Sequence, residues 1–125
     1  MADHFLRFPL FLAATAFFAA SPADAGKCGY DYCWGAITIG PDYASGRVIG
    51  KRTTKDAADA AIERCGEACS YPEVFQNSCG ALAASREGRV SFGGGETQTI
   101  AIKAAKEQCE VFGETCRLRV WACSF

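Results

Sequence analysis

The chain has 125 residues, of which 13 are basic and 14 acidic, and its net charge is −1. From Gly26 onward the net charge is zero, because one basic and two acidic residues lie before that point. This balance, without a basic stripe, argues against a nucleic-acid-binding protein.

The first 25 residues have the pattern of an export signal. Arg7 precedes an apolar run over residues 8–20, and Ala23 and Ala25 are small residues at the positions that a signal peptidase reads. The run is too short to span a bilayer comfortably, which favours a cleaved signal over a membrane anchor. The sequence therefore predicts cleavage after Ala25, a secreted or periplasmic protein, and no membrane span after cleavage.

The remaining 100 residues predict a short N-terminal segment, residues 26–32, and a single domain over residues 33–125. All eight cysteines lie in this part of the chain, and an even, dense set behind an export signal indicates disulfides. Zinc is the alternative, but no Cys-x-x-Cys pair is present, and the one histidine, His4, lies within the signal. We therefore expect a disulfide framework with no metal and no cofactor.

The first half of the domain predicts the order β-β-α-β. Residues 34–39 are a short apolar run, and residues 46–50 form a second strand candidate. Thr53 can cap a helix that carries an apolar stripe and ends at Gly66, a natural C-cap. Residues 74–76 form the third strand candidate.

The second half repeats this order at a near-constant spacing. Strands are expected at 80–84, 90–92 and 117–122, with a helix over about 97–111. The fold class predicted is α+β: two tandem β-β-α-β repeats, about 34–76 and 79–123. We expect them to share one mixed or antiparallel sheet, with both helices on one face.

Alternation of side chains along the strands then defines a second, helix-free face of that sheet. Four residues on it, Trp34, Phe75, Arg119 and Trp121, form a candidate binding face. The alternative is a second small core, covered by residues 26–32.

The repeat also predicts the disulfide pairing. Cys65 and Cys69 hold the same places in the first copy as Cys109 and Cys116 in the second, so each pair is expected to form a local bridge. Cys28–Cys33 is expected as a further local pair. Cys79–Cys123 then remains, with both residues on the helix-free face of the sheet.

Candidate catalytic and anion-binding groups are few. Residues 26–125 contain no histidine, which removes Ser-His-Asp and Cys-His arrangements. Two carboxylates could still cleave a glycoside, but the acidic residues fall mostly on expected helix or turn surfaces: Glu63, Glu67, Glu73, Glu96 and Glu107. Lys51 and Arg52 precede a helix and are a weak anion-site candidate, with solvated turn charges as the alternative.

Four motifs characterise residues 33–124. They are Cys33-Trp34-Gly35-Ala36, the alanine-rich helix that ends at Cys65, the central Asn77-Ser78-Cys79-Gly80-Ala81-Leu82, and the closing Val120-Trp121-Ala122-Cys123-Ser124. In combination they resemble a family of small secreted bacterial domains, the domain-of-unknown-function family 4189. The resemblance implies a disulfide-bearing exported domain and no catalytic residues.

The sequence as a whole favours a non-catalytic exported domain. The expected partner is an unknown protein, including an enzyme that the domain inhibits, or a glycan of the cell envelope. The alternatives are a carboxylate-dependent hydrolase of cell-wall glycan and a purely structural envelope protein.

Overall fold

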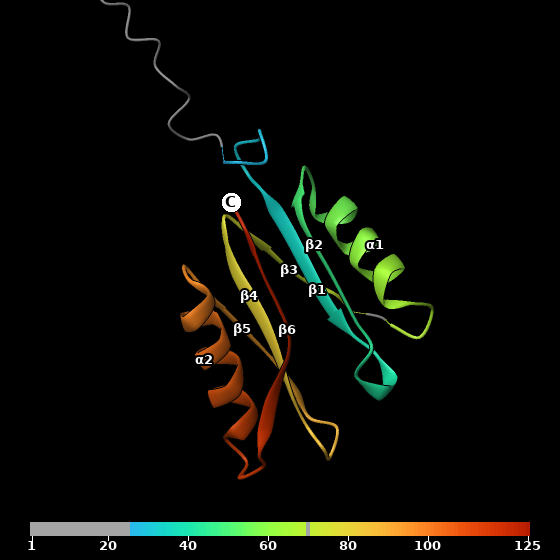
Figure 1. Ribbon diagram of the computed structural model, residues 1–125, viewed down its shortest axis with the longest axis vertical. Helices are drawn as coiled ribbons and strands as arrows, with labels where there is room; N and C mark the ends of the chain where they lie inside the picture. Colours follow the sequence, from blue (N-terminus) through green and yellow to red (C-terminus); the bar gives the residue numbers. More distant parts are fainter. Residues whose placement is uncertain (1–25, 70) are drawn as a thin grey trace, which may run out of the picture.

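The computed structural model describes residues 26–69 and 71–125, so the expected signal peptide, residues 1–25, lies outside the described residues. The elements run in the order expected for both halves (Figure 1). In the first half they are β1 (Trp34–Ile39), the short 3-10 helix η1 (Pro41–Tyr43), β2 (Ser45–Lys51), α1 (Thr54–Cys65) and β3 (Glu73–Gln76). In the second half they are β4 (Ser78–Ser85), β5 (Val90–Gly95), α2 (Gln98–Glu110) and β6 (Cys116–Ser124).

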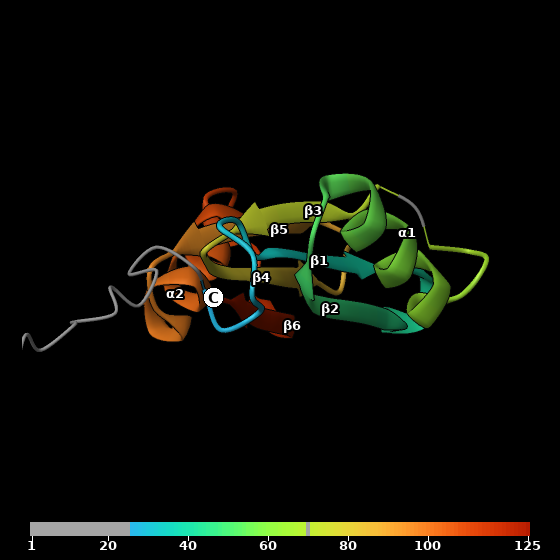
Figure 2. The ribbon, with the colours of Figure 1, turned by 90° about the horizontal axis from the view of Figure 1, so that it is seen from above.

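The strands form two antiparallel sheets of three strands each, in the orders β2-β1-β3 and β5-β4-β6. In both halves the first strand is central, the second is one edge, and the strand after the helix is the other edge. Figure 2 shows the resulting layers: α2, the second sheet, the first sheet and α1. The predicted α+β class with disulfides is therefore confirmed.

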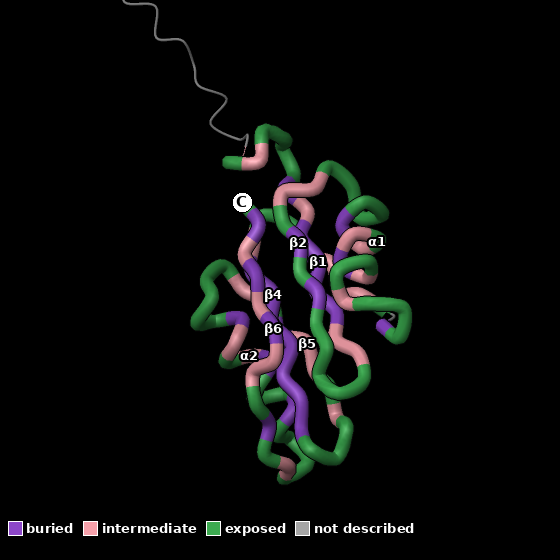
Figure 3. The backbone as a smooth tube through the Cα atoms, turned by 45° about the vertical axis from the view of Figure 1, so that its right-hand side comes forward, coloured by how far each residue is buried: buried purple, intermediate pink, exposed green. Residues whose placement is uncertain are grey.

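The expectation of one shared sheet with both helices on one face is wrong. Each sheet has its own helix on its outer face, and the inner faces of the two sheets pack against each other. The inner layer is a core of Ile37, Phe75, Leu82, Val120 and Ala122. The central strands are buried on both faces: β1 from Gly35 to Thr38, and β4 from Cys79 to Ser85 (Figure 3). A single sheet with helices on one side would expose half of this apolar surface to water.

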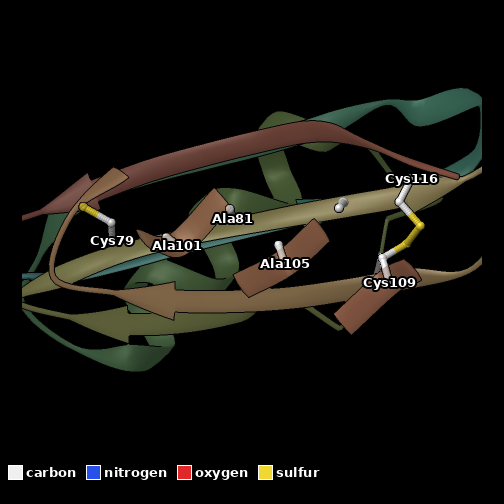
Figure 4. Packing of buried hydrophobic residues seen from close by; sticks show 7 residues of the cluster. Cys79, Ala81, Ala101, Ala105, Cys109 and Cys116 are labelled. Atoms are coloured by element: carbon white, nitrogen blue, oxygen red, sulfur yellow. A yellow bond between two sulfur atoms is a disulfide. The ribbon is translucent and has the colours of Figure 1, made fainter. Parts of the chain in front are cut away.

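Small residues let each helix approach its sheet closely. In the second half, alanines of α2 point at β4, and the Cys109–Cys116 bridge ties the end of the helix to β6 (Figure 4). The edge strands β2 and β5 also lie close to the helices. A Cβ at Gly46 of β2 would collide with the carbonyl oxygen of Ala61 in α1, and one at Gly93 of β5 with the backbone nitrogen of Ala105 in α2. Any larger residue at either glycine would push the helix off the sheet.

Side-chain caps begin both helices. The hydroxyl of Thr53 accepts a hydrogen bond from the backbone N–H of Asp56, and Thr97 accepts one from Ile100. Gly66, with φ of +114°, ends α1 as expected. None of the helices in the described residues is long and apolar enough to cross a membrane.

The chain passes from the first sheet to the second at Asn77, whose φ of +45° lies in the left-handed region. Its side-chain oxygen accepts a hydrogen bond from the backbone N–H of Cys33, and its amide nitrogen donates to the carbonyl of Asp31. The segment 26–32 is thereby held at one end of the sandwich, where Gly26 lies beside Phe125. It covers an end of the molecule rather than a sheet face.

The four disulfides are those that the sequence predicts: Cys28–Cys33, Cys65–Cys69, Cys79–Cys123 and Cys109–Cys116. Cys79 and Cys123 are directly opposite each other on β4 and β6, with their Cα atoms 3.9 Å apart. The predicted face is wrong, because this bridge packs in the core beneath α2.

Candidate functional site: a groove between strands β2 and β6

A groove made of two adjoining pockets, which share Arg47, Arg64 and Trp121, lies where the edge strand of one sheet, β2, faces the edge strand of the other, β6. Its cationic half has a volume of about 410 Å³ and is lined by Ser45, Gly46, Arg47, Arg64, Arg119, Val120 and Trp121. Its apolar half has about 420 Å³ and is lined by Arg47, Val48, Ile49, Arg64, Trp121, Ala122 and Cys123. We call the two halves together the β2–β6 groove.

Two arginines link the three elements around this groove. Arg64, in the last turn of α1, donates to the carbonyl oxygen of Arg47 on β2 at 2.9 Å. Arg47 in turn donates to the carbonyl oxygen of Trp121 on β6 at 3.0 Å, and its guanidinium lies 5.7 Å from the centre of the Trp121 ring. Each bond uses one nitrogen of a guanidinium that carries five N–H donors, so most donors of both side chains stay available.

Arg119 completes the cationic half from the middle of β6. Its guanidinium stacks on the Tyr43 ring, with 3.6 Å between the carbon of the guanidinium and the ring centre. The Tyr43 hydroxyl is itself held by the carbonyl of Ser85. Within the part of the chain that the structure describes, the buried Nε of Arg119 has no hydrogen-bond partner. The side chain is therefore positioned by stacking rather than by an acidic residue.

The charge of the groove is uncompensated. Among the described residues that line it, three are arginines and none is acidic. The ion pairs found in residues 26–69 and 71–125 lie elsewhere: Lys55–Asp59, Arg89–Glu114 and Lys103–Glu107. A domain without net charge thus carries a groove whose lining is cationic.

A second hollow, which Arg119 also lines, has a different balance of charge. This loop hollow, of about 580 Å³, is lined by Tyr43, Ala84, Arg86, Glu87, Phe112, Gly113, Glu114, Thr115, Arg117 and Arg119. Two carboxylates stand among its three arginines. Glu114 also accepts a hydrogen bond at 3.0 Å from Arg89, which does not line the hollow, and the guanidinium of Arg89 lies 4.0 Å from the Phe112 ring centre. The three arginines and two glutamates that line the loop hollow leave a net charge of +1, compared with +3 for the three arginines of the groove.

The four residues of the expected binding face do not share a face. Trp34 packs with the core beneath α1, and Phe75 is buried between the sheets. Trp121 packs partly against the core beneath α2 and also lines the β2–β6 groove, together with Arg119. Strand alternation brings the four residues together only in a single sheet with one free face.

Lys51 and Arg52 lie at the other end of β2 from the cationic half and do not line the groove. The guanidinium of Arg52 is 5.9 Å from the Tyr30 ring centre. The helix that follows already has an acidic residue, Asp56, in its first turn. The structure thus adds nothing that points to an anion at these two residues.

Sequence reasoning missed Arg47 and Arg64 as site residues. They lie 17 positions apart on a strand and a helix. Arg64 contacts Arg47, and Arg47 reaches Trp121 only because β2 and β6 face each other across the two sheets. A single sheet offers no such meeting point. In the described residues there is no group of three or more histidine, cysteine, aspartate or glutamate side chains that could hold a metal ion.

The fold and the groove define a class: a small, disulfide-bridged α+β domain with a cationic surface groove and helices outside two facing sheets. Residues 34–123 match the family described as "Domain of unknown function (DUF4189)". The chain belongs to this family, which confirms the resemblance seen in its motifs.

A solved structure also matches, the NMR structure of Rv1813c from Mycobacterium tuberculosis. The two sequences are 33% identical. The match covers 73% of this chain and 74% of the other chain, with a TM-score of 0.57. No curated protein matches the chain.

Proposed function

We propose that this protein is an exported, non-catalytic recognition domain that binds an anionic group of its partner in the β2–β6 groove. The observation that carries the proposal is the convergence of Arg47, Arg64 and Arg119 on a surface with no acidic residue among its described lining. A guanidinium presents a planar fork of donors that matches a carboxylate, sulfate or phosphate.

The expected affinity for a simple anion is modest. An exposed ion pair contributes only up to about 1 kcal/mol, so one arginine alone would not bind measurably. Three arginines around one anion, each at that limit, give about 3 kcal/mol together, which corresponds to a dissociation constant of about 6 mM. Tighter binding requires a ligand with several contacts.

Export is supported by the four disulfides, which are consistent with an extracellular or periplasmic protein. Cleavage after Ala25 belongs to the same proposal. Intact-mass measurement of protein recovered from the periplasm or medium tests it, with a mature N-terminus at Gly26 expected. A retained N-terminal segment would contradict the cleavage.

Calorimetric titration with hexaglutamate tests the anion site, using periplasm-derived protein with its disulfides formed. We expect binding that weakens as salt rises and that Arg64→Gln reduces. Arg86→Gln is the matched control, because it removes the same charge from the loop hollow. Absence of binding, or an equal loss in both variants, would contradict the groove as the site.

One observation favours a second candidate, a carboxylate-dependent glycan hydrolase: Glu87 and Glu114 line the same loop hollow. A glycosidase needs two carboxyl groups that flank the scissile bond. Glu114 instead contacts Arg89, which does not line the loop hollow, and this contact favours the non-catalytic proposal. Release of reducing ends from cell-wall glycan that is abolished by both Glu87→Gln and Glu114→Gln would establish the hydrolase instead.

A further inference from the structure

The β2–β6 groove has two chemically different halves. Ser45 and Arg119 lie in the cationic half, and Ile49 and Cys123 lie in the apolar half, while Arg47, Arg64 and Trp121 line both. Each half falls within the range of about 300–1,000 Å³ that is usual for ligand sites. A ligand that fills the whole groove must therefore present an acidic group and an apolar group together.

The length of the groove suggests the form of that ligand. From Ser45 to Ile49 the strand β2 advances four residues, or about 13 Å at 3.3 Å per residue. An extended peptide of about four residues spans the same distance. Its side chains at alternate positions point the same way, so an acidic residue and an apolar residue two positions apart would both reach the groove.

Resting on the proposed function, we propose that the occupant is an extended acidic segment of a partner protein. In this segment a glutamate or aspartate, held by the arginines, alternates with an aliphatic or aromatic residue that contacts Ile49. Ile49 is 56% exposed although it is aliphatic and lies on a strand, so it offers apolar area to a ligand.

An acidic glycan fits less well. Sugar recognition uses a free aromatic face and polar side chains that read the hydroxyl groups. The Trp121 ring is packed against the core beneath α2 and lies under Arg47. Ser45 is the sole uncharged hydrogen-bonding side chain, apart from the Trp121 indole, among the described residues that line the groove. An inorganic anion would fill only the cationic half.

Three matched ten-residue peptides test this inference by NMR titration of the disulfide-bonded protein. The first alternates glutamate with leucine, the second replaces each leucine with serine, and the third replaces each glutamate with glutamine. The first is expected to bind about tenfold more tightly than either of the others, because it alone gains both charge pairing and apolar burial.

Protein variants test which residues provide the apolar contact and which provide the charge pairing. Ile49→Ser should weaken the glutamate–leucine peptide and leave the glutamate–serine peptide unchanged, whereas Arg64→Gln should weaken both. Ile100→Ser is the matched control, since Ile100 is 51% exposed on α2, away from the groove. Ile49 is exposed, so its replacement is not expected to unfold the protein.

The outcomes separate this inference from the proposed function. Equal binding of the glutamate–leucine and glutamate–serine peptides would overturn the peptide inference. It would still be consistent with the proposed function, a groove that binds anions. Tighter binding of oligogalacturonate than of any peptide would overturn it in favour of an acidic glycan. No binding of hexaglutamate, oligogalacturonate or any peptide would overturn both proposals.

Discussion

The β2–β6 groove and the loop hollow each contain three arginines and share one of them, Arg119. They differ in their acidic residues. The loop hollow has Glu87 and Glu114, and Glu114 already pairs with Arg89, whereas none of the described residues that line the groove is acidic. The number of arginines therefore does not distinguish the two surfaces. We propose that the absence of compensating charge marks the groove as the binding surface, because an arginine without an internal partner keeps its donors for a ligand.

The largest expected effect comes from loosening β6, the strand that both sites use. The double change Cys79→Ser and Cys123→Ser opens a loop of about 45 residues, which in the chain-entropy model costs about 4 kcal/mol of unfolding free energy. It should also weaken anion binding, although no arginine is changed. Chemical denaturation and hexaglutamate titration measure the two effects.

The control for that change is Cys28→Ser with Cys33→Ser, a short loop at the end of the sandwich. It should cost about 2 kcal/mol and leave hexaglutamate binding intact. An equal loss of binding in both double variants would show that β6 has no special part in the site.

The next effect concerns Trp121, which belongs to the groove and to the core beneath α2. Trp121→Ala should lower the unfolding free energy by about 2–4 kcal/mol, slightly less than a fully buried tryptophan, because the ring is only partly buried. Trp121→Phe should restore most of this loss. Thermal unfolding measures both variants, and an unchanged midpoint for Trp121→Ala would show that the ring is a free surface rather than part of the core.

A third change makes the groove resemble the loop hollow. Ser45 is exposed in the cationic half, so Ser45→Glu places a carboxylate among the arginines. Hexaglutamate affinity should fall about tenfold, equivalent to 1.4 kcal/mol, while stability changes by less than about 1 kcal/mol. Ser45→Gln has a similar shape without the charge and should bind normally. Similar losses in the two variants would indicate that size rather than charge blocks the groove.

The smallest effect is expected from the reverse change in the loop hollow. Glu114→Gln frees Arg89, whose side chain is 35% exposed, and the lost ion pair should cost less than about 1 kcal/mol because solvent screens it. Arg89 should then gain weak sensitivity to sulfate, visible in the NMR signal of its side-chain N–H. No gain of sensitivity would contradict the argument that the acidic neighbour withholds this arginine.

Local features of this fold could be predicted from the sequence because they rest on nearby residues. Thr53 is a cap for α1, Gly66 ends that helix, and the spacing of the cysteines gives the four disulfide pairs. The cap and three of the bridges join residues at most seven positions apart, whereas Cys79–Cys123, 44 positions apart, follows as the pair that remains.

The arrangement of the two sheets could not be predicted in the same way. Strand alternation assigns Ile37 and Leu82 to one face and Ala36 and Ala81 to the other, but both faces are apolar, so the pattern does not say which one meets a helix. Alanine and glycine on the helix-facing side allow the close packing of the helices, while the larger residues fill the space between the sheets. The groove forms only when these larger residues face the other sheet. The sequence therefore did not predict that Arg47 and Arg64 line a common site.

The most direct test of the central claim is an NMR titration that follows the side-chain N–H signals of individual arginines as hexaglutamate is added. The account predicts that the signals of Arg47 and Arg64 shift and saturate together. It also predicts that the signal of Arg89, paired with Glu114, stays in place. Shifts of Arg89 equal to those of Arg47 and Arg64, or no shift at all, would contradict the claim that uncompensated charge makes the β2–β6 groove a binding site.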